Sequence, residues 1–403
     1  MVDIIGGTYY ESCVDPHWSE LFGSGLRAVN ALANLGPSIN FHTYADKETT
    51  ETLKYFAEAL IFNLFVTSIE KNVEFEYNHP LAEPFFSPPL WYFNKLKPIH
   101  LKSENTIVFG MLEGNAIIKG TKVVYDPQSP GYTKSFKQNG SEAEELIIVL
   151  NLTEAMNLAK EREIIKIANY IFQNEGAIAT IIKMGPLGAY LFKKESVLEP
   201  HYISPYITER VWPIGSGDIF TSVFGYEWMV NNTTLEIAAE KASLATAYYV
   251  NSQTLPIPNQ ISHQFPIFRK KDVVKKLYLA GPFFTMAQRW LVNEFRDNLI
   301  KMNVEVFSPM HDVGFGEAGV VATADLVGLE TCDMVLAIVD GLDSGTLFEI
   351  GYAKSRGISV LVFAENEKEE SLTMLKGTGC IFISDFSTAI YTAYWKLYND
   401  EIK

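Results

Sequence analysis

Short apolar runs alternate with helical patterns in the last third of the chain. The predicted strands are 277–280, 304–307, 334–339 and 359–363. The predicted helices, in which apolar residues recur at helical spacing, are 286–302, 323–330, 346–356 and 388–398. In the first of these helices we expect Trp290, Phe295 and Leu299 to face the core. Apolar strands that alternate with helices are typical of a parallel sheet covered on both faces, so we expect an α/β fold.

The first 250 residues contain similar alternations and end at a clear break. Apolar residues at helical spacing predict a helix over 235–250. Pro256 and Pro258 follow, and proline cannot continue a helix because it lacks the backbone N–H and restricts the preceding residue. We therefore expect a first domain over 1–252, a linker over 253–274 and a second domain over 275–403.

Composition supports this division and excludes several classes of protein. The chain has 403 residues, of which 47% are hydrophobic, and its formal charge of −15 results from 33 Lys+Arg against 48 Asp+Glu. This length favours two or three domains, and the composition is globular. An acidic chain is a poor partner for nucleic acid or anionic membranes, so we expect neither.

The cysteines and histidines indicate no metal site. The three cysteines lie far apart without a C-x-x-C spacing, which excludes a disulfide framework and a thiolate zinc site. Neither a signal peptide nor an apolar run of the ~20 residues that a transmembrane helix needs is visible. We therefore expect a soluble cytoplasmic protein.

An acidic stretch coincides with the predicted strand ends of the second domain. Nine Asp or Glu residues and no Lys or Arg lie between Glu305 and Glu349. Ligands of parallel sheets lie beyond the carboxyl ends of the strands, so we expect the chemistry at 280–284, 308–312 and 340–349. Glu349 lies near a helix start, with Ser344 as the predicted N-cap, and such a carboxylate is a candidate nucleophile. A solvated acidic face is the competing interpretation.

Two motifs in the second domain carry a family resemblance. They are Y-L-A-G-P-F-F at 278–284 and D-G-L-D-S-G-T-L-F-E-I-G-Y-A at 340–353. In these residues the segment of about 275–385 resembles the nucleoside 2-deoxyribosyltransferases. The resemblance implies a flavodoxin-like or Rossmann-like parallel sheet that needs no cofactor, acts as a homo-oligomer, and takes a deoxynucleoside or deoxynucleotide and a free nucleobase.

The same resemblance implies roles for individual residues. Glu349 would attack the anomeric carbon and form a glycosyl-enzyme ester, which a second base or water then resolves. Asp343 and Asp325 would contact the base, and the Tyr278 hydroxyl would steady the nucleophile. The implied substrate-binding residues are Gly281, Pro282, Asp340, Gly345 and Thr346.

Several alternatives remain open for this domain. Tyr278 is also a plausible core aromatic, Asp325 could simply begin a surface helix, and Asp340 could cap its loop. The reaction could be transfer to a base or hydrolysis by an N-glycosidase. A related class hydrolyses deoxynucleoside 5′-monophosphates, and the lack of Lys and Arg in 305–349 argues against such an anionic substrate.

The first domain has its strongest motif at 212–221, W-P-I-G-S-G-D-I-F-T. A Gly-x-Gly-Asp turn that opens a helix presents backbone N–H groups to an anion, and its aspartate can accept a hydroxyl proton. With Asp126-Pro127, Asn151 to Glu154, and the strand–turn–strand of 181–190, this motif resembles the ribokinase-like (PfkB) kinases over about 1–255. The resemblance implies an α/β sandwich that uses ATP and Mg²⁺.

In this resemblance Asp218 is the catalytic base. The implied anion-binding and nucleotide-binding residues are Gly215, Ser216, Gly217, Asn151 and Glu154. Important positions depart from the family pattern. Trp212-Pro213 replace Asp-Thr, Arg27 replaces an asparagine, and the early sugar-binding aspartate is missing, although Glu11 and Asp15 lie nearby. The lid segment is expected to be short or missing.

The departures leave two interpretations of the first domain open. It is an active kinase of a nucleoside or sugar, or a nucleotide-binding relic that regulates its partner domain. The whole chain is then a deoxyribosyltransferase or N-glycosidase fused to a ribokinase-like domain. The alternatives are a deoxynucleotide N-hydrolase that depletes a nucleotide pool and a nucleotide-sensing regulatory protein.

Overall fold

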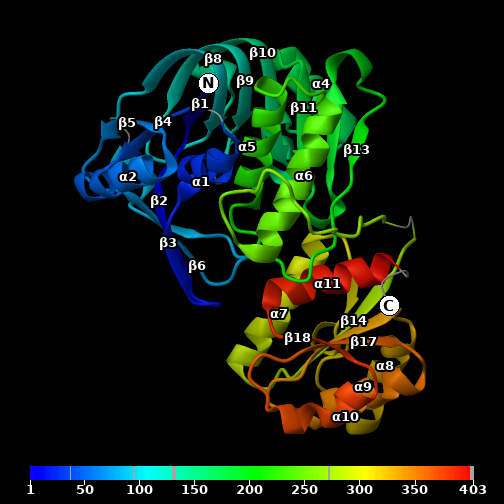
Figure 1. Ribbon diagram of the computed structural model, residues 1–403. Coiled ribbons are helices and arrows are strands. Elements are labelled where there is room, and N and C mark those ends of the chain that lie inside the picture. Colours follow the sequence, from blue (N-terminus) through cyan, green and yellow to red (C-terminus); the bar gives the residue numbers. More distant parts are fainter. Residues whose placement is uncertain (37, 94–95, 129–132, 271–272, 400–403) are drawn as a thin grey trace. The chain divides into compact units, whose positions relative to one another are not determined.

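The computed structural model describes residues 1–36, 38–93, 96–128, 133–270 and 273–399 (Figure 1). The chain divides into unit 1, Met1–Ile267, and unit 2, Phe268–Lys403. Residues 271–272 of the predicted linker and 400–403 of the predicted second domain lie outside the described residues. Ile257 is buried in the core of unit 1, and its amide donates to the Ala31 carbonyl. The first part of the predicted linker therefore packs as part of unit 1.

Unit 1 is built on a nine-stranded sheet of order β13-β12-β11-β10-β9-β8-β1-β4-β5. Neighbouring strands are parallel from β5 to β11, and β12 and β13 add antiparallel pairs. The strands are β1 Val2–Ile5, β4 Ile39–Ala45, β5 Asn63–Ser68, β8 Ile99–Phe109, β9 Ala116–Asp126, β10 Glu142–Asn151, β11 Ala179–Lys183, β12 Ala189–Lys193 and β13 His201–Ile203. The central strands are buried at their carboxyl halves, as expected of a covered parallel sheet.

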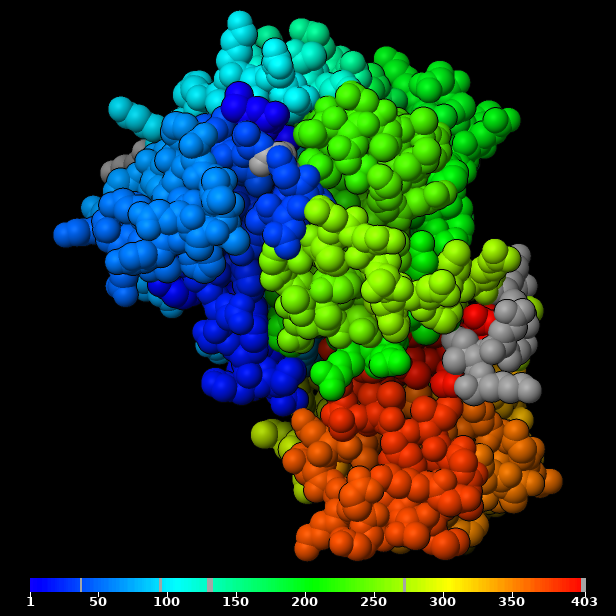
Figure 2. Space-filling model, in the orientation of Figure 1, coloured from blue at the N-terminus to red at the C-terminus, as the bar shows by residue number. Residues whose placement is uncertain are grey.

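Helices cover both faces of this sheet. The helices are α1 Gly23–Leu32, α2 Lys47–Leu60, α3 Leu152–Ala159, α4 Ile164–Asn174, α5 Ser216–Met229 and α6 Leu235–Ser252. α1, α5 and α6 contribute to one hydrophobic core, and α3 and α4 contribute to a second. α2 buries only Thr49 and Leu53, and its remaining side chains form part of the surface in Figure 2.

A separate four-stranded sheet of order β3-β2-β6-β7 completes unit 1. Its strands are β2 Tyr9–Cys13, β3 Trp18–Leu21, β6 Val73–Tyr77 and β7 Phe85–Ser87. The sequence analysis expected a short or missing lid segment and did not predict this second sheet. The sequence did not show it, since its short strands mix aromatic residues with glutamates and lack a continuous apolar run.

Unit 2 has a five-stranded, wholly parallel sheet of order β15-β14-β16-β17-β18. The strands are β14 Lys276–Ala280, β15 Glu305–Phe307, β16 Met334–Ile338, β17 Ser359–Phe363 and β18 Ile381–Ile383. The helices are α7 Met286–Lys301, α8 Ala318–Glu330, α9 Ser344–Ser355, α10 Thr373–Gly377 and α11 Phe386–Tyr398. Numbered along the chain, the strand order is 2-1-3-4-5, that of the flavodoxin-like doubly wound fold. The predicted α/β class is thus confirmed.

Two local predictions for unit 2 are wrong. Phe295 and Leu299 are buried, but Trp290 is 48% exposed. Val292 takes the core position instead, and a residue two places earlier on a helix points away from it. α8 also begins at Ala318, five residues before the predicted start, because its weakly patterned apolar sequence gave no boundary. Among the described residues, no helix is long and apolar enough to cross a membrane.

Candidate active site

The strand order of unit 2 has a topological switch point between β14 and β16. The chain leaves the two neighbouring strands in opposite directions, and such a switch point opens at the carboxyl ends of the strands. Tyr278 comes from β14, and Glu349 comes from α9, the helix that follows β16. The Tyr278 hydroxyl donates a 2.7 Å hydrogen bond to Glu349 Oε1. The two residues that the sequence assigned to nucleophile and positioning group are therefore adjacent.

The surroundings of Glu349 raise its proton affinity. The pKa of Glu349 is raised to about 7, mainly by burial, with a smaller contribution from the negative charges of Asp325 and Asp343, while the Tyr278 hydrogen bond lowers it. No ion pair of Glu349 with a cation occurs among the described residues. The carboxyl group thus titrates near neutral pH, and one neutral donor orients it.

Asp325 lies on α8 and is the least satisfied carboxyl group of this site. Its Oδ1 atom is buried and has no hydrogen-bond partner among the described residues. Burial raises the pKa of Asp325. A carboxyl group that is reluctant to ionise can remain protonated and serve as a proton donor.

Asp343 is the N-cap of α9, and Ser344 is not. Asp343 Oδ2 accepts from the Thr346 amide at 2.8 Å and from the Thr346 hydroxyl at 3.0 Å. The prediction placed the cap one residue too late, because aspartate and serine cap helices about equally well. Through this cap Asp343 fixes the first turn of α9, which contains Gly345 and Thr346 and precedes Glu349 by one further turn.

The other predicted substrate-binding residues shape the loops at the strand ends. The Asp340 carboxylate accepts from the amides of Glu365 and Asn366, at 3.1 and 2.8 Å, so it joins the loops after β16 and β17. A Cβ at Gly281 would lie 3.1 Å from Ile338 Cβ, which explains why glycine suits this tight contact. Pro282 beside it is buried.

Sequence reasoning missed an aromatic cluster next to this loop. The Phe283 ring lies 5.4 Å from Phe284 and 5.5 Å from Phe315, centre to centre. Arg289 donates to the Phe283 carbonyl at 2.8 Å and lies over the Phe315 ring. Phe284 and Phe315 are largely exposed. The adjacent phenylalanines after Gly281-Pro282 were the signal in the sequence. Apolar residues in a loop at the carboxyl ends of the strands seldom belong to the hydrophobic core.

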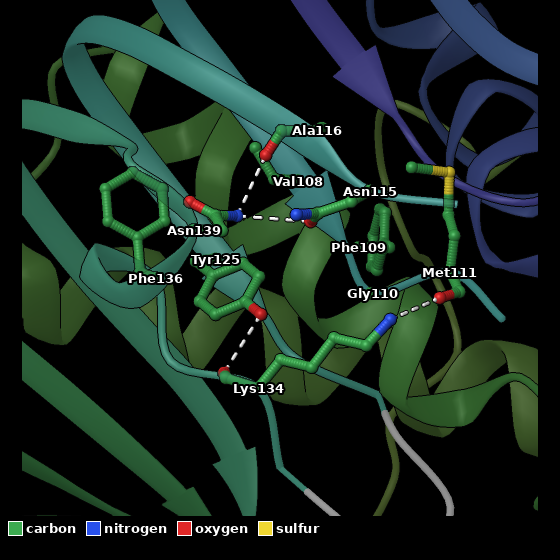
Figure 3. Close-up of a pocket in the computed structure, with 10 residues that line it drawn as sticks. All are labelled: Val108, Phe109, Gly110, Met111, Asn115, Ala116, Tyr125, Lys134, Phe136 and Asn139. Atoms are coloured by element: carbon green, nitrogen blue, oxygen red, sulfur yellow. Dashed lines mark hydrogen bonds between the residues drawn. The ribbon is translucent and has the colours of Figure 1, made fainter. Parts of the chain in front are cut away.

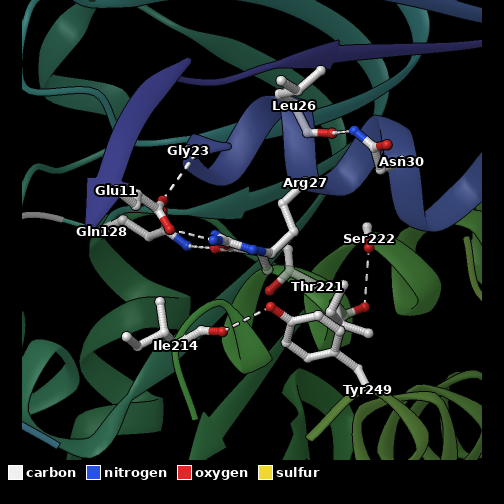
Figure 4. Close-up of polar contacts among 12 residues, drawn as sticks. Glu11, Gly23, Leu26, Arg27, Asn30, Gln128, Ile214, Thr221, Ser222 and Tyr249 are labelled. Atoms are coloured by element: carbon white, nitrogen blue, oxygen red, sulfur yellow. Dashed lines mark hydrogen bonds and ion pairs between the residues drawn. The ribbon is translucent and has the colours of Figure 1, made fainter. Parts of the chain in front are cut away.

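In unit 1 the structure brings Asp218 together with Arg27, which the sequence showed only as a departure, and with Gln128, which the sequence did not single out. Asp218 Oδ2 accepts from Arg27 at 2.6 Å, and Oδ1 accepts from the Gln128 side-chain amide at 2.5 Å. Arg27 also pairs with Glu11, and Glu11 accepts from the Gly23 amide at 2.9 Å. Figure 4 shows the Arg27 side chain pointing toward Glu11 and Gln128. All three charged groups are buried.

A second charged cluster lies at the carboxyl ends of the neighbouring strands. Asp126, at the end of β9, accepts from Lys183 and from Thr221, each at 2.8 Å. Asn151 and Glu154 form a reciprocal capping box at the start of α3. Burial, followed by the charge of Asp126, raises the pKa of Glu154 to about 7, although Lys183 opposes this. Of these five residues, only Asn151 and Glu154 were predicted as site residues.

This second cluster is a poor fit for Mg²⁺. The ion needs ionised oxygen ligands in a near-octahedral arrangement. Here Lys183 and Thr221 already bind one Asp126 oxygen, and Glu154 both caps a helix and resists ionisation. Across the described residues, no group of three or more His, Cys, Asp or Glu is arranged to hold a metal ion.

A small pocket in unit 1 lies at a different place. Phe109, Tyr125 and Lys134 help to line it, between the ends of β8 and β9 (Figure 3). Lys134 donates to the Met111 carbonyl at 2.9 Å, so its ammonium group is already bound within the chain. None of the predicted site residues lines this pocket.

Comparison with known proteins agrees with the resemblance stated for unit 2. Residues 277–381 match the family model described as nucleoside 2-deoxyribosyltransferase. This match includes the β14 motif, the acidic stretch and Glu349. No curated protein sequence matches the chain.

The solved structures similar to this chain cover its N-terminal part. A nucleoside kinase from Methanocaldococcus jannaschii, described as an archaeal ribokinase-family member, is 15% identical over 64% of this chain and 95% of its own, with a TM-score of 0.48. Ribokinases from Giardia lamblia and Thermotoga maritima are both 14% identical over 63% of this chain and 94% of theirs, with TM-scores of 0.48 and 0.44. The family match therefore lies in the C-terminal unit, and the solved structures similar to the N-terminal unit include ribokinase-family kinases.

Proposed function

We propose that unit 2 cleaves the N-glycosidic bond of a 2-deoxyribonucleoside, with Glu349 as the nucleophile. The observation that carries this proposal is the Tyr278–Glu349 pair at the β14/β16 switch point. The carboxylate in this place is partly buried, oriented by a neutral hydroxyl and free of any cation among the described residues. These are the conditions under which a carboxylate is oriented and remains nucleophilic.

The first step forms a bond between Glu349 and the anomeric carbon of the sugar. Tyr278 holds Oε1, which leaves Oε2 as the attacking atom. As the ester bond forms, the bond from the anomeric carbon to the base nitrogen breaks, and its electron pair moves to the base. This is the double-displacement logic of retaining glycosidases, in which a carboxylate carries the sugar as an ester.

The departing base needs a proton, and Asp325 is the better-placed donor. Its buried Oδ1 has no partner among the described residues, and burial raises its pKa, so Asp325 takes up a proton more readily than an ordinary aspartate. Asp343 has one oxygen committed to the Thr346 amide and hydroxyl. We assign proton donation to Asp325, and to Asp343 the positioning of α9 and contact with the base.

The second step determines whether the protein is a transferase or a hydrolase. A free nucleobase that attacks the ester takes up the sugar and returns the proton to the acid, whereas water releases free deoxyribose. The acidic surroundings favour an uncharged nucleoside over a 5′-monophosphate, because no Lys or Arg occurs between Glu305 and Glu349.

Product analysis tests this proposal. The full-length protein is incubated with each deoxynucleoside and each deoxynucleoside 5′-monophosphate, with and without a free acceptor base, and the products are separated by chromatography. Exchanged nucleoside indicates transfer, and free base without exchange indicates hydrolysis. We expect Glu349→Gln to lose at least about 10³-fold in rate, as enzymes do when a nucleophile is removed.

A matched control separates this effect from a general loss of helical charge. Glu330 is an exposed glutamate on α8 that pairs with Arg356. Glu330→Gln should retain cleavage within about twofold, since exposed ion pairs contribute little. Cleavage that survives Glu349→Gln, or that is lost equally in Glu330→Gln, contradicts the proposed nucleophile.

A further inference from the structure

Both carboxylate oxygens of Asp218 in unit 1 already accept hydrogen bonds from side chains of the protein itself. Arg27 donates to its Oδ2 at 2.6 Å and Gln128 donates to its Oδ1 at 2.5 Å. Arg27 itself is only 2% exposed and is shared with Glu11. A general base has to accept a proton from a hydroxyl within hydrogen-bond distance, and here a guanidinium group and an amide already bind both oxygens.

The Arg27 side chain also covers the glycine turn at the start of α5. A Cβ at Gly215 would lie 2.2 Å from Arg27 Nε and 2.4 Å from Arg27 Cδ. Gly215 has a φ of 79°, which glycine adopts without strain, and it is the N-cap of α5. The stem of Arg27 therefore fills the space beside the residue where an anion would approach the amides of this turn.

The four-stranded sheet of unit 1 is also joined to Arg27. β2 supplies Glu11, which pairs with Arg27 and accepts from the Gly23 amide at 2.9 Å. From the same strand, the Tyr9 hydroxyl donates to Glu113 Oε2 at 2.7 Å. Glu113 precedes β9 of the large sheet, so β2 is joined to the body of unit 1 at two buried points.

Without a ligand, the two cations of this centre are already engaged by three carboxylates. Arg27 faces Glu11 and Asp218, and Lys183 faces Asp126. A bound nucleotide phosphate would have to approach three carboxylates whose cationic partners are already engaged, and the second cluster suits Mg²⁺ poorly, as described above. The residues present thus do not fit ATP with Mg²⁺ in a phosphoryl-transfer geometry.

We propose that the Arg27 side chain permanently occupies the site beside Asp218 and Gly215 in unit 1. Asp218 then acts as the ion-pair partner of Arg27, and unit 1 transfers no phosphoryl group. The buried Glu11–Arg27–Asp218 triad holds the four-stranded sheet and the start of α5 together. The feature that resembles a kinase base is here part of the packing of unit 1. This inference is independent of the reaction proposed for unit 2.

The effect of Asp218→Asn on the unfolding midpoint tests the proposal in the full-length protein, because this effect should change sign when Arg27 is removed. Calorimetry at pH 8 follows the unfolding midpoint of unit 1 in the wild type, Asp218→Asn, Arg27→Met and the double variant. In the wild type, Asp218→Asn removes an ion-pair partner and should lower the midpoint by several degrees. In the Arg27→Met background it removes one of two facing buried carboxylates, so it should raise the midpoint.

Asp46 provides the control for this cycle. It caps α2 through the Thr49 amide and makes no hydrogen bond or ion pair with Arg27 among the described residues. Asp46→Asn should change the midpoint equally in the two backgrounds, because asparagine is an equivalent cap. If Arg27→Met does not fold, Arg27→Lys replaces it. Lysine keeps the charge but not the two-pronged geometry, so Asp218→Asn should then lower the midpoint by less than in the wild type.

A transfer assay completes the test. The wild type and Asp218→Asn are given ATP, Mg²⁺ and a panel of nucleosides and pentoses, and phosphorylated products are measured. We expect no product above that of Asp218→Asn. Product that depends on Asp218 overturns the proposal, and so does an Asp218→Asn shift of the same sign and size in both Arg27 backgrounds.

Discussion

Two acidic centres of this chain lie at the carboxyl ends of parallel strands, yet the hydrogen-bond partners of their carboxyl groups differ in charge. In unit 2 a tyrosine hydroxyl holds Glu349, and no cation pairs with it among the described residues. In unit 1 Asp218 is bound by the Arg27 guanidinium and by the Gln128 amide. A carboxylate next to a neutral donor keeps its reactivity, whereas one paired with a buried guanidinium becomes part of the core.

The difference has an energetic basis. Burial raises the pKa of Glu349 to about 7, so its ionised form is costly at neutral pH, and proteins retain such groups mainly where chemistry uses them. Burial lowers the pKa of Arg27, but Glu11, Tyr249 and Asp218 outweigh this effect and raise it well above the ordinary value. Arg27 therefore stays charged, and the triad stabilises unit 1 only while all its members are present.

The largest predicted effect is the loss of Arg27. Arg27→Met leaves two buried carboxylates without their cation, which should cost unit 1 about 3–5 kcal/mol of unfolding free energy at pH 8. Burial already raises the pKa of Glu11, and the loss of Arg27 removes the charge that lowers it. A carboxyl group with a raised folded-state pKa destabilises above that pKa and not below the unfolded value.

The pH dependence checks this account of Arg27. Denaturant unfolding should show a larger loss at pH 8 than at pH 5, where a carboxyl group takes up a proton. A loss of the same size at both pH values would mean that packing of the Arg27 side chain, and not its charge, holds the centre together.

The second prediction concerns the pH dependence of kcat/KM for cleavage by unit 2, on the acidic side where the rate falls (the acid limb). The proposed mechanism requires ionised Glu349, so kcat/KM should fall as pH drops through about 7. Tyr278→Phe removes the hydrogen bond that lowers the pKa of Glu349, and the limb should move to higher pH. Asp325→Asn removes a negative charge, and the limb should move to lower pH, each by about half to one unit.

These two substitutions contradict the assignment if both shift the limb in the same direction. Asp325→Asn should in addition lower the plateau rate for poor leaving groups, since it removes the proposed proton donor. Replacement of the natural base by one that needs no proton should restore that plateau in Asp325→Asn and not in Glu349→Gln.

The smallest predicted effect is at the cap of α9. Asp343→Ala removes the acceptor for the Thr346 amide and should cost unit 2 about 1 kcal/mol, whereas Asp343→Asn should cost only a few tenths of that. Thermal unfolding followed by calorimetry measures both. Equal losses in the two variants would indicate that the charge of Asp343, and not its cap, stabilises α9.

Unit 2 was predictable because its signals are local and repeated. Apolar strands such as 334–338 and 359–363 are buried on both faces and read as continuous runs, so element order and the site loops could be inferred from the sequence. Tyr278 and Glu349 followed from a dense motif near those strand ends. Trp290 was misplaced because one aromatic residue on an amphipathic helix does not show which face it takes.

Unit 1 was less predictable because its centre is assembled from distant segments. Glu11, Arg27, Gln128 and Asp218 lie on four different elements or loops, and no spacing in the sequence relates them. Arg27 was visible only as a departure from a pattern. Its meaning depends on side-chain geometry, since the same arginine on an outward face of α1 would have been an ordinary surface charge.

A paired measurement on Glu349→Gln and Asp218→Asn tests the contrast between the two centres most directly. Cleavage of deoxynucleosides and the unfolding midpoints of both units are measured at pH 8 for the two variants and the wild type. Glu349→Gln should abolish cleavage and raise the midpoint of unit 2, because an ionised group with a pKa near 7 against an ordinary 4.5 costs stability above pH 7. Asp218→Asn should leave cleavage intact and lower the midpoint of unit 1. Cleavage that survives Glu349→Gln, or an Asp218→Asn variant of unchanged stability, would contradict the account.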